Sequence, residues 1–258
     1  MKTTLSLDFM ASVTVAFRGK TITVAQEDFV ERGDGVDTTG RLVWECSAVF
    51  LKLLGSDAFF SRITGGAVEG GATLLDLSCG AGLVPLALAR LGQPLVKVVH
   101  AWETREQLPL LRRNLAPVLQ EGDPGGCHLG AYYWGQDPRA LLGDAQLDGA
   151  LCCDVLYIAL RDNLALQLSS SLRQLAGLLR GEGAILFGFE ERLMREEEAF
   201  MASLAQPEQG LDGGPAAPAL RVEELPVEAT RLSREETIGS PDIFWQSPDV
   251  RFFLLRRL

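Results

Sequence analysis

The stretch Leu74 to Gly92, LLDLSCGAGLVPLALARLG, decides the fold. It begins with an apolar run that ends in Asp76, continues through a turn of small residues and closes with a second apolar segment. This pattern predicts a buried strand, a glycine turn and a helix around Pro85, because proline is tolerated in the first turn of a helix. In open α/β sheets, ligands bind beside the carboxyl end of such a strand. The stretch therefore raises the question of which ligand its turn is shaped for.

Strands and helices are predicted to alternate after this stretch. Strand segments without polar faces are typical of a parallel sheet that helices cover on both sides. We expect strands over 73–77, 96–101, 129–133, 147–153 and 183–189, with closing strands at 220–225 and 250–258, and helices over 43–54, 83–91, 105–119, within 162–179 and over 195–205. The prediction is a Rossmann-like, mostly parallel sheet of about seven strands with helices on both faces.

Residues 1–40 precede this α/β pattern. The segment SVTVAFRGKTITVAQ alternates apolar and polar residues on both sides of Arg18-Gly19-Lys20, which predicts an N-terminal β-hairpin. Residues 27–40 are acidic and contain glycine, so we expect a connecting loop. We divide the chain into a hairpin extension with its loop, residues 1–40, and one domain, residues 41–258, in which proline, glycine and alanine make 206–219 an irregular loop.

The composition excludes several classes of protein. A formal charge of −10 argues against binding to nucleic acid or to an anionic membrane surface, since both select clustered Lys and Arg. No apolar run reaches the ~20 residues of a membrane helix, and the first residues lack the uninterrupted apolar core of a signal peptide. We expect a monomer in the cytoplasm, with the nucleus left open as a second location.

The cysteines and histidines predict neither disulfides nor a metal site. The five cysteines are odd in number and contain no C-x-x-C pair, which favours a reducing compartment. His100 and His128 have no paired ligand spacing, so no zinc or other metal is expected.

The glycine turn departs from the two common phosphate-binding motifs. In the dinucleotide fingerprint G-x-G-x-x-G, the register that begins at Gly80 puts Pro85 at the third glycine. The Gly-Lys-Ser/Thr of a Walker loop is absent. An NAD-linked oxidoreductase is therefore a distant alternative.

Two acids at strand ends point to a different cofactor. A carboxylate at Asp76 opposes a diphosphate but suits a cationic ligand. S-adenosylmethionine is such a ligand, because it carries an ammonium, a sulfonium and a ribose diol but no phosphate. Glu103 ends the next expected strand, where an acid accepts ribose hydroxyls in dinucleotide folds. The alternative, that both acids are ordinary caps or surface residues, stays open.

From Val13 to about Leu204 the chain resembles methyltransferase family 16, the class I S-adenosylmethionine-dependent group that includes the non-SET protein-lysine methyltransferases. Five short motifs carry the resemblance, in the family's order: Val43-Trp44-Glu45, DLSCGAGL at 76–83, Trp102-Glu103 with Asn114, Trp134-Gly135, and DVLY at 154–157. The resemblance implies a Rossmann-like methyltransferase that acts on a lysine ε-amine of a protein substrate. The alternatives are another acceptor (arginine, histidine or a small-molecule amine) and a non-catalytic binding module.

The same resemblance implies roles for individual residues. Asp154 and Tyr157 would line the opening for the accepting amine and act as the catalytic pair. Trp134 would lie beside the adenine and Trp44 would border the cofactor. The implied cofactor-binding residues are Trp44, Asp76, Ser78, Cys79, Gly80, Gly82, Glu103, Trp134 and Cys153.

Some positions depart from the family's pattern or extend it. Ser78 replaces the family's first glycine and puts a Cβ and a hydroxyl where the backbone approaches the methionine part of the cofactor. Trp102 stands where a threonine is usual. Arg192 resembles an arginine that the family carries after the fifth strand, which leaves a substrate-side role open. It lies in the charged run from Glu190 to Phe200, which predicts a solvated helix face.

Overall fold

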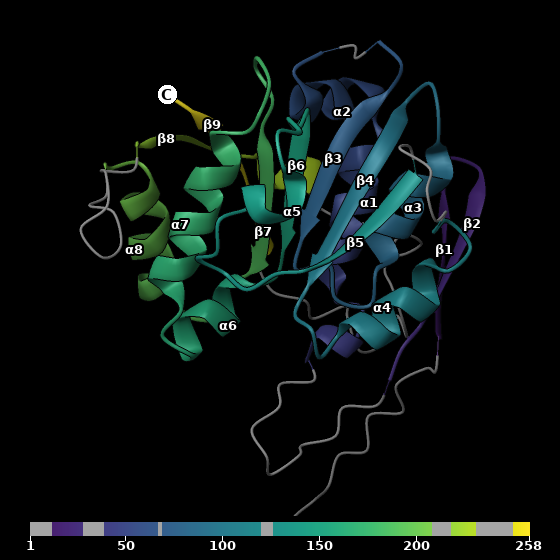
Figure 1. The fold of residues 1–258 in the computed structure, drawn as a ribbon. Coiled ribbons are helices and arrows are strands. Elements are labelled where there is room, and N and C mark those ends of the chain that lie inside the picture. The colour runs from purple at the N-terminus through teal and green to yellow at the C-terminus, as the bar shows by residue number, and fades with distance from the viewer. Residues whose placement is uncertain (1–11, 28–38, 67–68, 120–125, 208–217, 231–249) are drawn as a thin grey trace, which may run out of the picture.

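The computed structural model describes residues 12–27, 39–66, 69–119, 126–207, 218–230 and 250–258. Within these residues a seven-stranded sheet lies between two layers of helices, as predicted (Figure 1). The strand order is β5-β4-β3-β6-β7-β9-β8. The strands are β3 (Ala72–Leu77), β4 (Val96–Glu103), β5 (Gly126–Ala131), β6 (Gly149–Cys153), β7 (Ile185–Glu190), β8 (Leu220–Glu224) and β9 (Val250–Arg257).

The direction of the strands places the ligand site. Strands β3 to β7 are parallel, whereas β9 runs antiparallel to both β7 and β8. The chain leaves β3 toward β4 and β5 on one side and returns to β6 and β7 on the other. A crevice forms at such a switch point, outside the carboxyl ends of the strands. The end of β3, with Asp76, lies at this point.

Two apolar clusters fill the space between the sheet and its helices. Adjacent residues of a strand point to opposite faces, so Leu74 packs into one cluster and Leu75 into the other. The first cluster lies under α1 (Glu45–Gly55), α2 (Asp57–Thr64), α3 (Leu83–Leu91) and α4 (Leu108–Leu115), and the second under α5 (Arg139–Leu142), α6 (Leu156–Arg161), α7 (Ala165–Ala176) and α8 (Met194–Leu204). None of the helices in the described residues has the length and hydropathy to cross a membrane.

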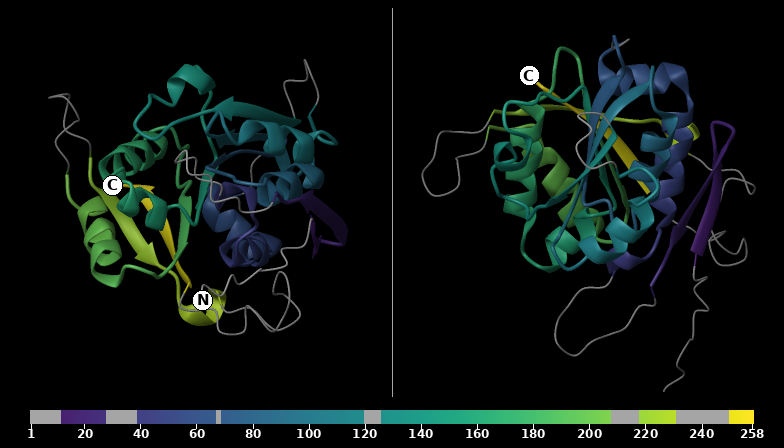
Figure 2. Two further views of the ribbon diagram at one scale, coloured as in Figure 1. Left: turned by 90° about the horizontal axis from the view of Figure 1, so that it is seen from below. Right: turned by 45° about the vertical axis from the view of Figure 1, so that its right-hand side comes forward.

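The predicted hairpin is present as β1 (Ser12–Phe17) and β2 (Lys20–Ala25). It lies on the outer side of the α1–α4 layer (Figure 2), and its apolar side chains, including Ile22, join the first cluster. Asn114 of α4 fixes it near the ligand site. The Asn114 amide donates to the carbonyls of Ala25 and Ala81, both at 2.8 Å, and its Oδ1 accepts from Ala25 N. One buried amide thus joins the hairpin to the glycine turn.

Several boundaries differ from the sequence prediction. Helix α4 covers only Leu108–Leu115, and strand β5 begins at Gly126. Helix α2 lies between the helix predicted over 43–54 and the strand predicted over 73–77, where no element is predicted. The Ser56 side chain accepts a bond from Phe59 N and begins a second helix. Short helices α5, α6, α9 (Val227–Thr230) and the 3-10 turn η1 (Thr39–Arg41) were also missed. Residues 28–38 of the expected connecting loop and 208–217 of the expected irregular loop lie outside the described residues.

Candidate active site

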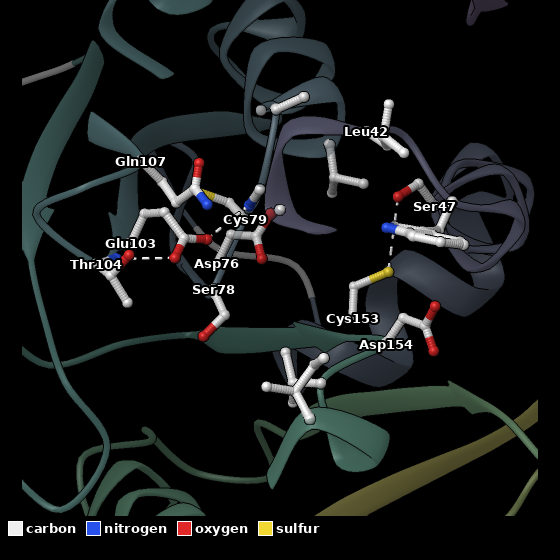
Figure 3. Close-up of a pocket in the computed structure, with 18 of the residues that line it drawn as sticks. Leu42, Ser47, Asp76, Ser78, Cys79, Glu103, Thr104, Gln107, Cys153 and Asp154 are labelled. Carbon is white, nitrogen blue, oxygen red and sulfur yellow. Dashed lines mark hydrogen bonds between the residues drawn. The ribbon is translucent and has the colours of Figure 1, made fainter. Parts of the chain in front are cut away.

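A cavity of about 690 Å³ opens at the carboxyl ends of the parallel strands. Residues from five strand ends and from the segment before α1 surround it. Figure 3 shows Asp76 and Glu103 on one side of it and Ser47, Cys153 and Asp154 on the other. Every residue predicted for the site lies in its wall: Trp44, Asp76, Ser78, Cys79, Gly80, Gly82, Glu103, Trp134, Cys153, Asp154 and Tyr157.

The glycine turn after β3 is built from left-handed residues. Gly80 has a φ of 53° and Gly82 a φ of 87°, a region that favours glycine. Space is also short, because a Cβ at Gly80 would lie 3.0 Å from the Gly40 carbonyl oxygen and one at Gly82 would lie 2.6 Å from Leu111 Cδ1. These glycines therefore let η1 and α4 pack closely against the turn.

The amides of the turn hold it to β4 and to its acid. Ser78 N and Cys79 N both donate to the Trp102 carbonyl, at 2.9 and 3.1 Å, and Gly80 N donates to Glu103 Oε2 at 2.8 Å. The resemblance implies backbone contacts from these three residues to a cofactor. Since the N–H groups of these three residues already have partners within the protein, only their carbonyls and side chains can contact a cofactor.

Glu103 is a buried acid whose two oxygens are each held by an amide. Its Oε1 accepts from Thr104 N at 2.7 Å and its Oε2 from Gly80 N. Burial raises the pKa of this carboxyl, and the two amide bonds oppose that shift. A carboxylate oxygen can accept more than one bond, so both oxygens can still take a hydroxyl from the cavity. The carboxylate is thus fixed in place as an acceptor.

Asp76 is buried at 1% exposure, and its Oδ1 accepts no hydrogen bond from any residue that the structure describes. Burial, and then repulsion from Glu103, raises its pKa to about 8. Burying a carboxylate without a partner costs free energy, so a hydrogen-bond donor or a cation bound in the cavity would stabilise this oxygen.

Together these features fit S-adenosylmethionine. The cavity volume lies within the roughly 300–1,000 Å³ of small-molecule sites. The unpartnered Asp76 oxygen suits an ammonium, and the fixed Glu103 carboxylate suits a diol. The indole of Trp134 adds an aromatic face to the wall.

The two departures from the family's pattern have structural compensations. Ser78 has a φ of 64°, and its hydroxyl accepts a hydrogen bond from Trp134 Nε1 at 3.0 Å. Trp102 does not line the cavity. It is 2% exposed and stacks on Tyr132 in the second apolar cluster, with ring centroids 4.8 Å apart. A Cβ at Gly130 would lie 2.6 Å from the Trp102 ring, so glycine there makes room for the large side chain.

On the other side of the cavity, Asp154 follows β6 with a φ of 53°. Its side chain is 5% exposed. Oδ1 accepts from Glu190 N at 3.1 Å, and Oδ2 lies 3.4 Å from Arg192 Nη2. Burial raises the pKa of this carboxyl, whereas Arg192 lowers it. Asp154 is thus held between its own strand end and the end of β7.

Arg192, for which the resemblance leaves a substrate-side role open, lines the same cavity as the predicted site residues. Its guanidinium lies 5.4 Å from the centre of the Trp44 ring and 5.2 Å from that of Tyr157, and it forms ion pairs with Asp154 and Glu190. The prediction of a solvated face for the surrounding charged run is wrong at Glu197. That side chain is fully buried and accepts from Arg192 N.

Sequence reasoning missed other residues of the wall. Ser47 of α1 lies with its hydroxyl 3.7 Å from Cys153 Sγ, and Thr104 and Gln107 lie beside Glu103 (Figure 3). Thr104 directly follows Glu103, so its place after a predicted strand end could have indicated that it lines the site. For Ser47 and Gln107 no spacing in the sequence indicated the site.

Comparison with known proteins gives one family. A family model described as lysine methyltransferase, methyltransferase family 16, matches residues 25–207. No curated protein matches the sequence.

Solved structures give only distant similarity. TrmN from Thermus thermophilus is 17% identical, with a TM-score of 0.47, over 77% of this chain and 47% of its own. The chain therefore spans about half the length of that protein. A precorrin-6y C5,15-methyltransferase from Geobacter metallireducens is 13% identical, with a TM-score of 0.46, over 88% of this chain and 96% of its own. A TehB-like methyltransferase from Corynebacterium glutamicum is also 13% identical, with a TM-score of 0.44, over 77% of this chain and 86% of its own.

Proposed function

The chain belongs to the lysine methyltransferase family whose model matches residues 25–207, and we propose that it methylates the ε-amine of a lysine in a protein substrate. Its cofactor is S-adenosylmethionine, which supplies an electrophilic methyl group on a sulfonium. One observation carries the proposal. The buried acid Asp154 faces the same cavity as the buried pair Asp76 and Glu103, and the cation paired with it, Arg192, lies over the rings of Trp44 and Tyr157.

The Asp76 side of the cavity is proposed to hold the cofactor. Asp76 binds its ammonium, and the Glu103 oxygens accept the ribose hydroxyls while the Gly80 and Thr104 amides keep the carboxylate in place. Trp134 borders the adenine. The hydrogen bond from the Trp134 indole to the Ser78 hydroxyl fixes the orientation of the indole.

The Asp154 side of the cavity is proposed to receive the substrate amine. A carboxylate and two aromatic rings around one position attract a cation to it by charge and through the ring quadrupoles. The amine must lose a proton before its lone pair can attack. Burial raises the pKa of Asp154, which makes it a better proton acceptor than an exposed carboxylate. Alignment of the amine and exclusion of water supply the rest of the acceleration.

Labelling tests this function directly. The purified protein is incubated with methyl-labelled S-adenosylmethionine and an extract from cells that lack it, and labelled proteins are mapped by peptide mass spectrometry. We expect label on lysine in one or a few proteins. The matched negative control is Asp154→Asn, because asparagine tolerates the left-handed backbone at this position.

Other outcomes identify the alternatives. Label on arginine or histidine, or only in small molecules, would contradict the lysine acceptor but keep the methyltransferase. Tight binding of S-adenosylhomocysteine with no label in any fraction would favour a non-catalytic module.

A further inference from the structure

The guanidinium of Arg192 occupies the part of the cavity to which the substrate amine is assigned. We propose that Arg192 is a resident cation, which the amine replaces at the Asp154 carboxylate during turnover. The identity of the incoming group as an amine rests on the proposed function. The presence of a cation site at this position rests on the geometry alone.

The groups around Arg192 come from four separate segments and have complementary chemistry. Trp44 precedes α1, Asp154 follows β6, Tyr157 lies in α6 and Glu190 ends β7. Both ring centres lie within the roughly 6 Å at which a cation is attracted to an aromatic face. Two carboxylates and two rings around one cation are the chemistry of a cation-binding site. We call these four residues the cation cage.

The two ion pairs of Arg192 differ in strength and position. The pair with Glu190 is close and lies at the rim, where both side chains are about one quarter exposed. The pair with Asp154 is longer, at 3.4 Å, and reaches a carboxylate that is 5% exposed. The guanidinium can therefore leave Asp154 while it keeps Glu190. The backbone N–H of Arg192 is held by the buried Glu197, so the movement is confined to the side chain.

Charge balance favours an exchange of one cation for another. Without Arg192 or a substrate, Asp154 would carry a buried charge with no cation beside it, which is unfavourable. An incoming ammonium restores the balance when it replaces the guanidinium. Arg161 also lies over the Tyr157 ring, at 5.9 Å, but it pairs with Asp162 in an exposed position. It is not among the residues that line the cavity and therefore provides a matched control.

The test measures binding of n-butylammonium, which has the four-carbon chain and ammonium of a lysine side chain. It is titrated by calorimetry at neutral pH into the complex of each protein with S-adenosylhomocysteine. We expect Arg192→Ala and Arg192→Gln to bind the probe about tenfold more tightly than the wild type, because the cage then has no resident cation. Arg192→Lys keeps a cation there, and Arg161→Ala leaves the cage intact, so both should resemble the wild type.

Equal affinity of the wild type and the neutral variants for the probe would overturn the inference. So would tight binding by Arg192→Lys, because a filled cage should exclude the probe. Retained binding of S-adenosylhomocysteine checks that a variant is folded, and either neutral variant alone decides the outcome. The titration does not depend on methyl transfer. If the neutral variants bind the probe no more tightly but lysine is labelled in the extract, the inference about Arg192 fails and the proposed function stands. If the neutral variants bind the probe more tightly but no protein is labelled, the inference stands and the proposed function fails.

Discussion

The hydroxyl of Ser78 accepts a hydrogen bond from the indole N–H of Trp134 at 3.0 Å, across the cavity wall from the glycine turn to the segment after β5. The side chain that departs from the family's glycine is thus used to fix an aromatic ring of the site. The left-handed backbone of Ser78, with a φ of 64°, is the strained conformation that accompanies this contact.

The Ser78–Trp134 contact predicts energetic coupling. We expect Ser78→Ala and Trp134→Phe, which each remove one partner, to show a coupling of about 1 kcal/mol in a double-mutant cycle of urea unfolding. Ser78→Gly should be about 1 kcal/mol more stable than Ser78→Ala, because glycine adopts positive φ without a Cβ penalty. Additive effects of the two substitutions would show that the hydrogen bond contributes nothing.

Asp76 predicts a pH-dependent affinity for the cofactor product. Its pKa of about 8 means that the carboxyl is mostly protonated at neutral pH in the free protein. A bound ammonium favours the ionised form, so the affinity for S-adenosylhomocysteine should rise, by up to about tenfold per pH unit, as the pH approaches 8 from below. Calorimetry across this range checks it, and Asp76→Asn should abolish the dependence while Glu106→Gln keeps it.

The same carboxyl predicts a change in stability with pH. Its folded pKa is raised above the unfolded value of about 4. Stability from this group is therefore full below about pH 4 and is lost progressively as the pH rises to about 8. In the absence of ligand, the free energy of unfolding of Asp76→Asn, measured in urea, should rise relative to that of the wild type as the pH increases over this range. A constant difference between the two proteins would contradict the assigned cause.

Glu103 predicts a selective loss of cofactor affinity. In Glu103→Gln one oxygen becomes an NH₂ group, which cannot accept from Gly80 N or Thr104 N. We expect S-adenosylhomocysteine to bind at least about tenfold more weakly. The exposed Glu106, which contacts the hydroxyl of Tyr133, is the matched control. Equal effects of Glu103→Gln and Glu106→Gln would argue against a specific role.

Asp154 predicts a separation of binding from transfer. Asp154→Asn keeps the shape and tolerates the positive φ but removes the charge. We expect methyl transfer to fall by about 100-fold, the scale of a lost charge-assisted contact, and the affinity for S-adenosylhomocysteine to stay nearly unchanged. Steady-state kinetics and calorimetry measure the two quantities. Parallel losses would place Asp154 with the cofactor instead.

Much of the fold could be predicted because local pattern and strand direction determine it. The apolar runs at 73–77 and 183–189 are buried on both faces and lack polar alternation, which is typical of a covered parallel sheet. Parallel strands end at the same edge, so residues at or just after the ends of separate strands, such as Asp76, Glu103 and Asp154, had to lie near one another. The sequence alone therefore placed these three acids at one edge of the sheet.

Only the tertiary structure decided how the side chains of the site are paired. No spacing in the chain relates Arg192 to Trp44, because their contact depends on how α1 and the end of β7 pack against the sheet. The pKa of Asp76 depends on burial and on the distance to Glu103, neither of which a sequence contains. The sequence determined which strand-end residues lie at this edge of the sheet, since the periodicity that predicts parallel strands is a local property. Packing determined which charges meet inside it, since electrostatic interactions act through space.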